Sequence, residues 1–198
     1  MLIKGLLLGF SIAAPVGPIG LLCLRRGLER GFLAAFTSGL GAATADACYG
    51  LVGALGLAAV STLLIGQTAW LRVGGGIFLL WLAWQTWRAA PSHPAATGGG
   101  GRLWRGYLST LLLTLSNPMT ILSFAAIFAG LGIAEGDRGD GVLLVVGVFL
   151  GSALWWSMLA WLATHLAARI GPRQLIAINR LSALALGGFA VWSFIGAV

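Results

Sequence analysis

Long apolar runs alternate with short polar connections along almost the whole chain. A membrane-spanning helix needs about 20 predominantly apolar residues, and six stretches reach or approach that length. They cover residues 3–24, 33–60, 71–87, 107–133, 142–166 and 175–198. The pattern predicts an all-α integral membrane protein, a six-helix bundle that forms one transmembrane domain over residues 1–198.

The first and fourth of these segments are both interrupted by proline. The interruptions contain six candidate site residues: Pro15, Gly17, Pro18, Asn117, Pro118 and Thr120. Proline removes a backbone N–H and clashes with the preceding turn, so it breaks a helix and frees backbone groups that protein or cavity water must satisfy. Broken helices at matching places in two halves are typical of inverted-repeat transporters, and they predict a 3+3 repeat with a site at the membrane midplane. The alternative is that the prolines only kink the helices and have no role in transport. Asn117 and Thr120 would then only form hydrogen bonds with the freed backbone groups.

The composition is typical of a membrane protein, and the distribution of charge predicts its orientation in the membrane. Of the 198 residues, 59% are hydrophobic and only 9% are charged, whereas soluble domains carry about 25% charged residues. Positive residues accumulate in cytoplasmic loops, and nine of the twelve basic residues fall in three alternate connections: Arg25, Arg26, Arg30, Arg88, Arg102, Arg105, Arg169, Arg173 and Arg180. This predicts that these connections are cytoplasmic and both termini are outside. The net charge of +7 is interpreted as a topology signal, with no nucleic-acid partner.

Asp46 is the only acidic residue within the predicted spans. An aspartate at the centre of a membrane helix costs about 2.5–3.5 kcal/mol on insertion scales, so it faces the bundle interior or a wet cavity and is a functional candidate. Its carboxylate could bind a substrate ammonium or carry a proton, and a structural hydrogen bond near a helix end is the alternative. Tyr49, three positions further on, can share its helix face. Trp155 or Trp156, deep in the fifth segment, could line a cavity, with packing or lipid contact as the alternative.

Motifs for other chemistry are missing from the sequence. It contains no phosphate-binding loop, no hydrolase triad in reach of a polar pocket, and no cluster with metal-ligand spacing. We therefore expect no enzyme activity, no cofactor and no resident metal. Cys23 and Cys48 lie in apolar segments and are interpreted as small buried residues. A membrane thiol–disulfide relay, a metal-ion exporter on a related scaffold and a purely structural membrane subunit are the alternative functions.

Around both breaks the sequence resembles the LysE/RhtB family of amino-acid translocators. The similarity is carried by residues 15–20, 25–32 and 115–122 together with Asp46 and Tyr49, and it extends over nearly the whole chain. The resemblance implies a multi-pass secondary transporter that exports amino acids or related small metabolites across the bacterial inner (plasma) membrane. It leaves the substrate, the coupling ion and the oligomeric state open, a homo-oligomer included.

A zwitterionic substrate would suit these residues. Helix N-termini at the two breaks would offer N–H groups to its carboxylate, and Asp46 would offer a negative charge to its ammonium. A cationic side chain would want a second carboxylate, which the spans lack. The sequence therefore favours a neutral amino acid.

Overall fold

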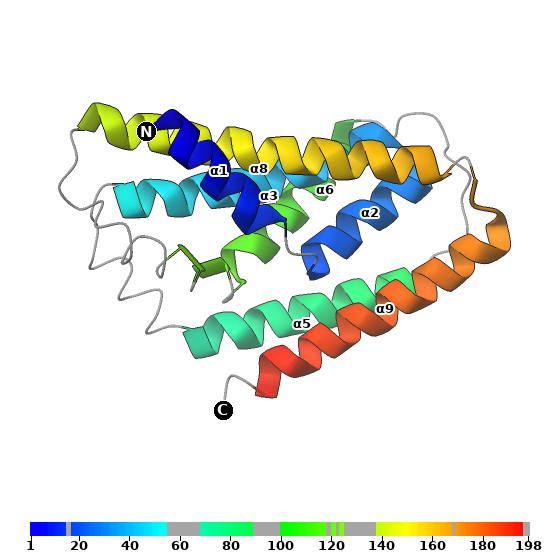
Figure 1. Ribbon diagram of the computed structural model, residues 1–198. Helices are drawn as coiled ribbons and strands as arrows, with labels where there is room; N and C mark the ends of the chain where they lie inside the picture. The colour runs from blue at the N-terminus through cyan, green and yellow to red at the C-terminus, as the bar shows by residue number, and fades with distance from the viewer. Residues whose placement is uncertain are drawn as a thin grey trace.

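The computed structural model describes residues 1–14, 17–54, 68–88, 100–117, 120–121, 123–124, 138–167 and 169–195. Within these residues all regular secondary structure is helical, as predicted. Seven helices are labelled (Figure 1): α1 (Leu2–Ala13), α2 (Pro18–Arg30), α3 (Phe32–Ala54), α5 (Thr68–Trp87), α6 (Gly100–Leu115), α8 (Arg138–Ala167) and α9 (Pro172–Ile195).

Two of these helices are by themselves long and apolar enough to cross a membrane, over Asp140–Ala167 in α8 and Arg173–Ile195 in α9. The helices α1 and α2 meet the same criterion as one broken span, with a bend of 82° between them. Large apolar side chains such as Leu154, Met158 and Trp161 are exposed on α8, a surface suited to lipid. The described residues therefore supply two or three spans, and the count of six and the 3+3 repeat stay predictions.

The first predicted span, residues 3–24, consists of two helices in the structure. Helix α1 ends at Ala13, and α2 begins at Pro18 with Gly17 as its N-cap. Proline is favoured at the first helical position because the N–H that it lacks has no partner within the helix. A broken first segment was expected from the prolines, and the described break lies between Ala13 and Pro18; Pro15 itself is outside the described residues.

Helix α2 continues to Arg30, beyond the predicted end at residue 24, and stops at Gly31, whose φ of 83° favours glycine. The prediction that Arg25 lies in a connection is wrong, because Arg25 is helical and buried, and so is Glu29 one turn further along α2. Asp46 is consequently not the only buried acidic residue of the bundle. The run of apolar residues ends before Arg25, but an ion pair within the helix lets the charged turn continue inside the protein.

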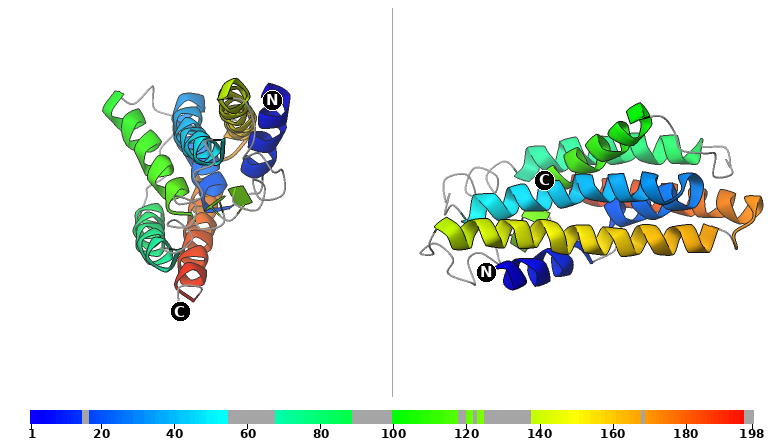
Figure 2. Two further views of the ribbon diagram at one scale, coloured as in Figure 1. Left: turned by 90° about the vertical axis from the view of Figure 1, so that its left-hand side faces the viewer. Right: turned by 90° about the horizontal axis from the view of Figure 1, so that it is seen from above.

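The helices form two groups with α2 between them (Figure 2). One group holds α1, α3, α6 and α8, in which α8 packs on α1 and α3, and α3 packs on α6. The other is the pair α5 and α9, which contact each other extensively. Helix α2 contacts α3 and α8 on one side and α9 on the other, so it connects the two groups.

Glycines bring the helices of the larger group close together. A Cβ atom at Gly41 of α3 would overlap the carbonyl oxygen of Tyr107 in α6, and one at Gly151 of α8 would overlap the carbonyl oxygen of Leu6 in α1. Small residues at such points let helix backbones approach, which matters in lipid because the hydrophobic effect there does not drive helix association. These contacts fix α1 and α6, the helices that lead into the two breaks.

The described helix ends are divided between the two ends of the bundle (Figure 1). The junction of α2 and α3, the end of α5, the start of α6 and the connection of α8 to α9 lie at one end. The start of α1 and the end of α9 lie toward the other. We call the first of these ends the basic end, because Arg30, Arg88, Arg102 and Arg173 lie at or next to the helix ends that are found there.

Candidate functional site

The two broken segments meet inside the protein, although they belong to opposite halves of the chain. Gly17 and Pro18 from the first break and Asn117 and Thr120 from the second line the same two cavities, together with Ile12 of α1. The structure thus brings four of the predicted site residues together. Pro15 and Pro118 lie outside the described residues.

The smaller cavity, of about 60 Å³, contains Asp46 in its wall. Asp46 lies in the interior of α3 rather than near a helix end, and its side chain is only 3% exposed. Its Oδ2 accepts a hydrogen bond of 2.7 Å from the hydroxyl of Ser152 in α8. The indole Nε1 of Trp156 donates to the same Ser152 oxygen over 3.1 Å, and Trp156 also lines this cavity. The carboxylate is therefore held in a defined orientation across the α3–α8 contact.

Ser152 was not predicted from the sequence. Its signal was a hydroxyl four residues before Trp156, on the same helix face. An ionised carboxylate offers about four acceptor positions, and Ser152 is the hydrogen-bond donor to Asp46 among the described residues. The cavity beside it can supply further donors from a ligand or from water, which needs roughly 10–15 Å³ per molecule.

Tyr49 lies beside the break rather than in the wall of either cavity. Its hydroxyl donates a 2.6 Å hydrogen bond to the carbonyl of Leu115, the last residue of α6. A carbonyl at a helix C-terminus has no partner within the helix, so Tyr49 satisfies a backbone group at the second break. The ring of Tyr49 also packs on Phe124, with 5.6 Å between the ring centroids. Tyr49 therefore stabilises the second break and does not contact the cavities directly.

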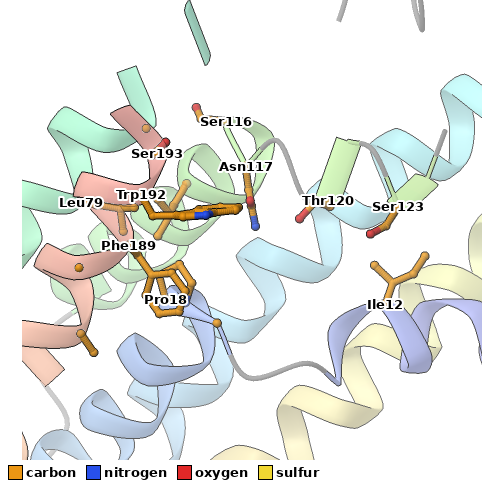
Figure 3. A pocket seen from close by; sticks show the side chains of 15 residues that line it. Ile12, Pro18, Leu79, Ser116, Asn117, Thr120, Ser123, Phe189, Trp192 and Ser193 are labelled. Atoms are coloured by element: carbon orange, nitrogen blue, oxygen red, sulfur yellow. The ribbon is translucent and has the colours of Figure 1, made fainter. Parts of the chain in front are cut away.

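The larger cavity, of about 610 Å³, lies between the broken segments and the α5–α9 pair. Its apolar side is formed by Leu79 of α5 with Phe189 and Trp192 of α9, and Thr120 and Ser123 lie on the other side of Asn117 (Figure 3). Binding sites for small molecules commonly measure about 300–1,000 Å³ and combine apolar walls with a few polar groups. The cavity has the size and the lining of such a site.

A second polar cluster, which sequence reasoning missed, lies toward the basic end between α2, α5 and α9. The guanidinium of Arg25 donates to Glu29 Oε1 over 3.0 Å, to Asn179 Oδ1 over 3.2 Å and to Thr86 Oγ1 over 2.6 Å. All four side chains are buried. We call this the Arg25 cluster. The spacing of Arg25 and Glu29, four residues apart on one helix, was the signal in the sequence.

The neighbouring Arg26 ties α2 to the other helix group. It donates to the hydroxyls of Ser38 and Ser109, over 2.8 and 2.7 Å, and to the carbonyl of Gly106 over 3.0 Å. Two adjacent arginines therefore fasten α2 to α5 and α9 on one side and to α3 and α6 on the other. Hydrogen bonds from charged groups are stronger than those between neutral groups, so α2 is firmly held in this conformation.

The remaining candidates for chemistry gain no support. Within the described ranges no group of three or more His, Cys, Asp or Glu side chains could hold a metal ion. Cys23 and Cys48 are free thiols; Cys23 is buried, but Cys48 is exposed. The interpretation of Cys48 as a buried residue is wrong, because α3 turns it away from the core. Nothing in this arrangement favours a metal pathway or a thiol–disulfide relay.

Comparison with known proteins decides the family. The family model of the LysE type translocators matches residues 10–195. The chain belongs to this family. The predicted resemblance is confirmed, and no solved structure matches this LysE-type translocator significantly.

Curated relatives match most of the length of the chain. It is 31% identical to the uncharacterized membrane protein YahN of Escherichia coli, over 83% of this chain and 75% of the relative. It is 28% identical to the arginine exporter protein ArgO of Pectobacterium carotovorum, over 96% and 94%. It is 26% identical to the lysine exporter LysE of Corynebacterium efficiens, over 96% of each chain. The last two relatives are named as exporters, not as enzymes.

Proposed function

We propose that this LysE-type translocator is a secondary transporter that exports amino acids or related small metabolites across the bacterial inner membrane. The observation that carries the proposal is the meeting of two broken helices, from opposite halves of the chain, at cavities beside the buried Asp46. Relatives named as arginine and lysine exporters support it. The broken helices expose backbone groups, and the cavities give a small molecule room to reach them.

The smaller cavity offers both charges that an amino-acid head group needs. Helix α2 begins at Pro18, with Gly17 as its N-cap, and a helix N-terminus carries a partial positive charge and free N–H groups. Asp46 lines the same cavity. The substrate carboxylate therefore lies at the start of α2, and its ammonium lies at Asp46. Asn117 and Thr120 add an amide and a hydroxyl from the second break.

The helix contacts support a 3+3 inverted repeat. In such a repeat, α1 is equivalent to α6, α3 to α8, and α5 to α9. The contact of α1 with α8 then corresponds to the contact of α6 with α3. The contacts of α3 with α8 and of α5 with α9 each correspond to themselves. The close approaches at Gly41 and Gly151 are related in the same way, since each lets a helix of one half meet the first helix of the other. Inverted repeats of this kind underlie alternating access in secondary transporters.

The basic end is cytoplasmic in this proposal. Reporter fusions after Arg88 and after Arg169 are therefore expected to report the cytoplasm, and a fusion at Val198 the exterior. The physical reason is that arginines near span ends resist translocation. Neutralising Arg102 and Arg105 together should weaken the preference of this end for the cytoplasm. The matched control is Gln85→Asn, which changes no charge. A cytoplasmic Val198 fusion in the unaltered chain would contradict both the topology and the inverted repeat.

We infer that the conformation is closed toward the basic end. Leu22 of α2, Leu82 of α5 and Leu186 of α9 belong to one buried apolar cluster, and on α2 and α5 the leucines lie between cavity-lining residues and the Arg25 cluster. We call the three leucines and the Arg25 cluster together the inner gate. Transport then requires this gate to open so that substrate can enter from the cytoplasm.

Export itself is tested in a host that lacks its own amino-acid exporters and is fed dipeptides. Cells that express the protein are expected to release at least one amino acid at a rate about tenfold or more above cells with an empty vector, since carrier-mediated efflux bypasses the bilayer. Divalent metal ions belong in the same panel. Release of no amino acid by correctly inserted protein would refute the proposal, and release of metal alone would favour a metal exporter.

A further inference from the structure

The proposed head-group position leaves the larger cavity for the substrate side chain. Ile12, Gly17, Pro18, Asn117 and Thr120 line both cavities, so a molecule held at Asp46 can continue directly into the larger one. That cavity measures about 610 Å³, against about 60 Å³ for the smaller. Most of the space that the site offers is therefore available to the side chain, and the lining of the larger cavity decides which side chains are accepted.

The described part of this lining is uncharged. None of its described residues is Asp, Glu, Lys or Arg. Its polar members are hydroxyl and amide side chains, such as Ser116, Asn117 and Ser193, and the rest are apolar or glycine. A cationic side chain would lose its hydration here without gaining a carboxylate, which is unfavourable for a charge.

An arginine next to the apolar wall adds to this discrimination. The guanidinium of Arg72 lies 5.9 Å from the ring centroid of Trp192, and the carbonyl of Arg72 accepts a 2.8 Å hydrogen bond from Ser193. Trp192 and Ser193 both line the larger cavity. A positive charge behind the cavity wall repels a lysine or arginine side chain in the cavity more than it affects an uncharged one.

The apolar wall favours large side chains over small ones. Leu79, Leu113, Phe189 and Trp192 come from three helices and face one space. A side chain of one or two carbons would leave most of this wall uncovered. Because affinity rises with the apolar area that binding removes from water, a branched aliphatic or aromatic side chain gains most.

We propose that the substrates of this translocator are amino acids with large uncharged side chains, aromatic or branched aliphatic, which fill the larger cavity against Leu79, Phe189 and Trp192. The inference rests on the proposed function, because it places the substrate head group at Asp46. It separates this protein from its relatives that are named as arginine and lysine exporters.

The test measures efflux of phenylalanine, leucine, alanine, lysine and arginine from proteoliposomes loaded to equal concentrations. Phenylalanine and leucine are expected to leave about tenfold faster than lysine and arginine. Trp192→Ala should raise the apparent KM for phenylalanine about tenfold and change that for alanine little. Trp161→Ala, an exposed tryptophan of α8, is the matched control and should leave every rate unchanged.

A second variant adds the missing charge. Ala185 lines the larger cavity, so Ala185→Asp should increase lysine and arginine efflux several-fold, whereas Ala185→Asn should not. Wild-type efflux of lysine or arginine as fast as that of phenylalanine would overturn the inference and leave the proposed function standing. An equal loss for phenylalanine and alanine in Trp192→Ala would also overturn it. Efflux of no amino acid would refute the proposed function, and the inference with it.

Discussion

Replacing Asp46 with asparagine is expected to reduce amino-acid export by about 100-fold or more. Removing one partner of a buried, hydrogen-bonded charge pair costs about 2–5 kcal/mol, and each 1.4 kcal/mol corresponds to about a tenfold change. In this protein the pair would form between the Asp46 carboxylate and the substrate ammonium in the smaller cavity. The measurement is the initial rate of efflux at equal amounts of membrane-inserted protein. Insertion should be unimpaired, since the variant removes a charge from the bilayer.

Three variants refine this prediction. Asp46→Glu keeps the charge but moves it by one methylene group, so partial export is expected. Ser152→Ala removes the hydroxyl that donates to Asp46 and should reduce export less than Asp46→Asn, because the carboxylate remains. Thr44→Ala is the matched control: Thr44 also lies on α3, but it pairs with Tyr107, outside both cavity walls. Export by Asp46→Asn at the wild-type rate would move the site to Asn117 and the backbone of the breaks.

The pH profile distinguishes two roles of Asp46. If its carboxyl group carries the coupled proton, the rate of wild-type export depends on pH. Asp46→Asn then abolishes this pH dependence. If it only binds the ammonium, Asp46→Asn leaves slow exchange with a raised apparent KM and the same pH profile as the wild type. Counterflow in proteoliposomes without a pH gradient measures the exchange alone.

Much of the candidate site could be predicted because its signals are local. Proline breaks a helix whatever surrounds it, so two interruptions in two halves of the chain predict where the fold is irregular. A lone aspartate in an apolar helix must face the protein interior, and Asp46 does so. Family membership followed from the same residues. None of these inferences required knowledge of which helix packs on which.

What the sequence could not provide is the identity of neighbours across helix contacts. Spacing puts Tyr49 on the face of Asp46, but its long side chain reaches Leu115 of α6 instead of the cavity. Ser152 contacts Asp46 only because α8 packs on α3. Arg25 was assigned to a connection because hydropathy ends a span at the first charges. An ion pair and two hydrogen-bond partners on other helices are what allow it to be buried.

The inner gate is expected to open when its buried ion pair is broken. Glu29→Gln removes the negative charge beside Arg25 while keeping a side chain of similar size. Breaking a buried ion pair by removing one partner costs about 3–5 kcal/mol. The closed gate contains this pair, so the variant should shift the protein toward conformations in which Arg25 reaches water and the gate is open.

Opening of the gate can be measured at Leu82. This residue is 5% exposed, and it lies on α5 about one helical turn from both Leu79 in the cavity wall and Thr86 in the Arg25 cluster. In a protein with Cys23 and Cys48 replaced by alanine, Leu82→Cys should be labelled slowly by a membrane-impermeant maleimide in inside-out vesicles. Adding Glu29→Gln is expected to raise the labelling rate about tenfold or more.

Two controls separate gate opening from general loosening of the fold. Arg30→Gln removes a charge from the exposed end of the same helix without touching the Arg25 cluster, and should leave labelling of Leu82→Cys slow. Replacing Arg25 with methionine and Glu29 with leucine together should slow labelling again, because replacing a whole buried ion pair by apolar residues is often neutral or stabilising. The same double variant should export poorly if the gate must become wet to admit substrate. Equal labelling of Leu82→Cys with and without Glu29→Gln would mean that the Arg25 cluster does not hold the gate closed.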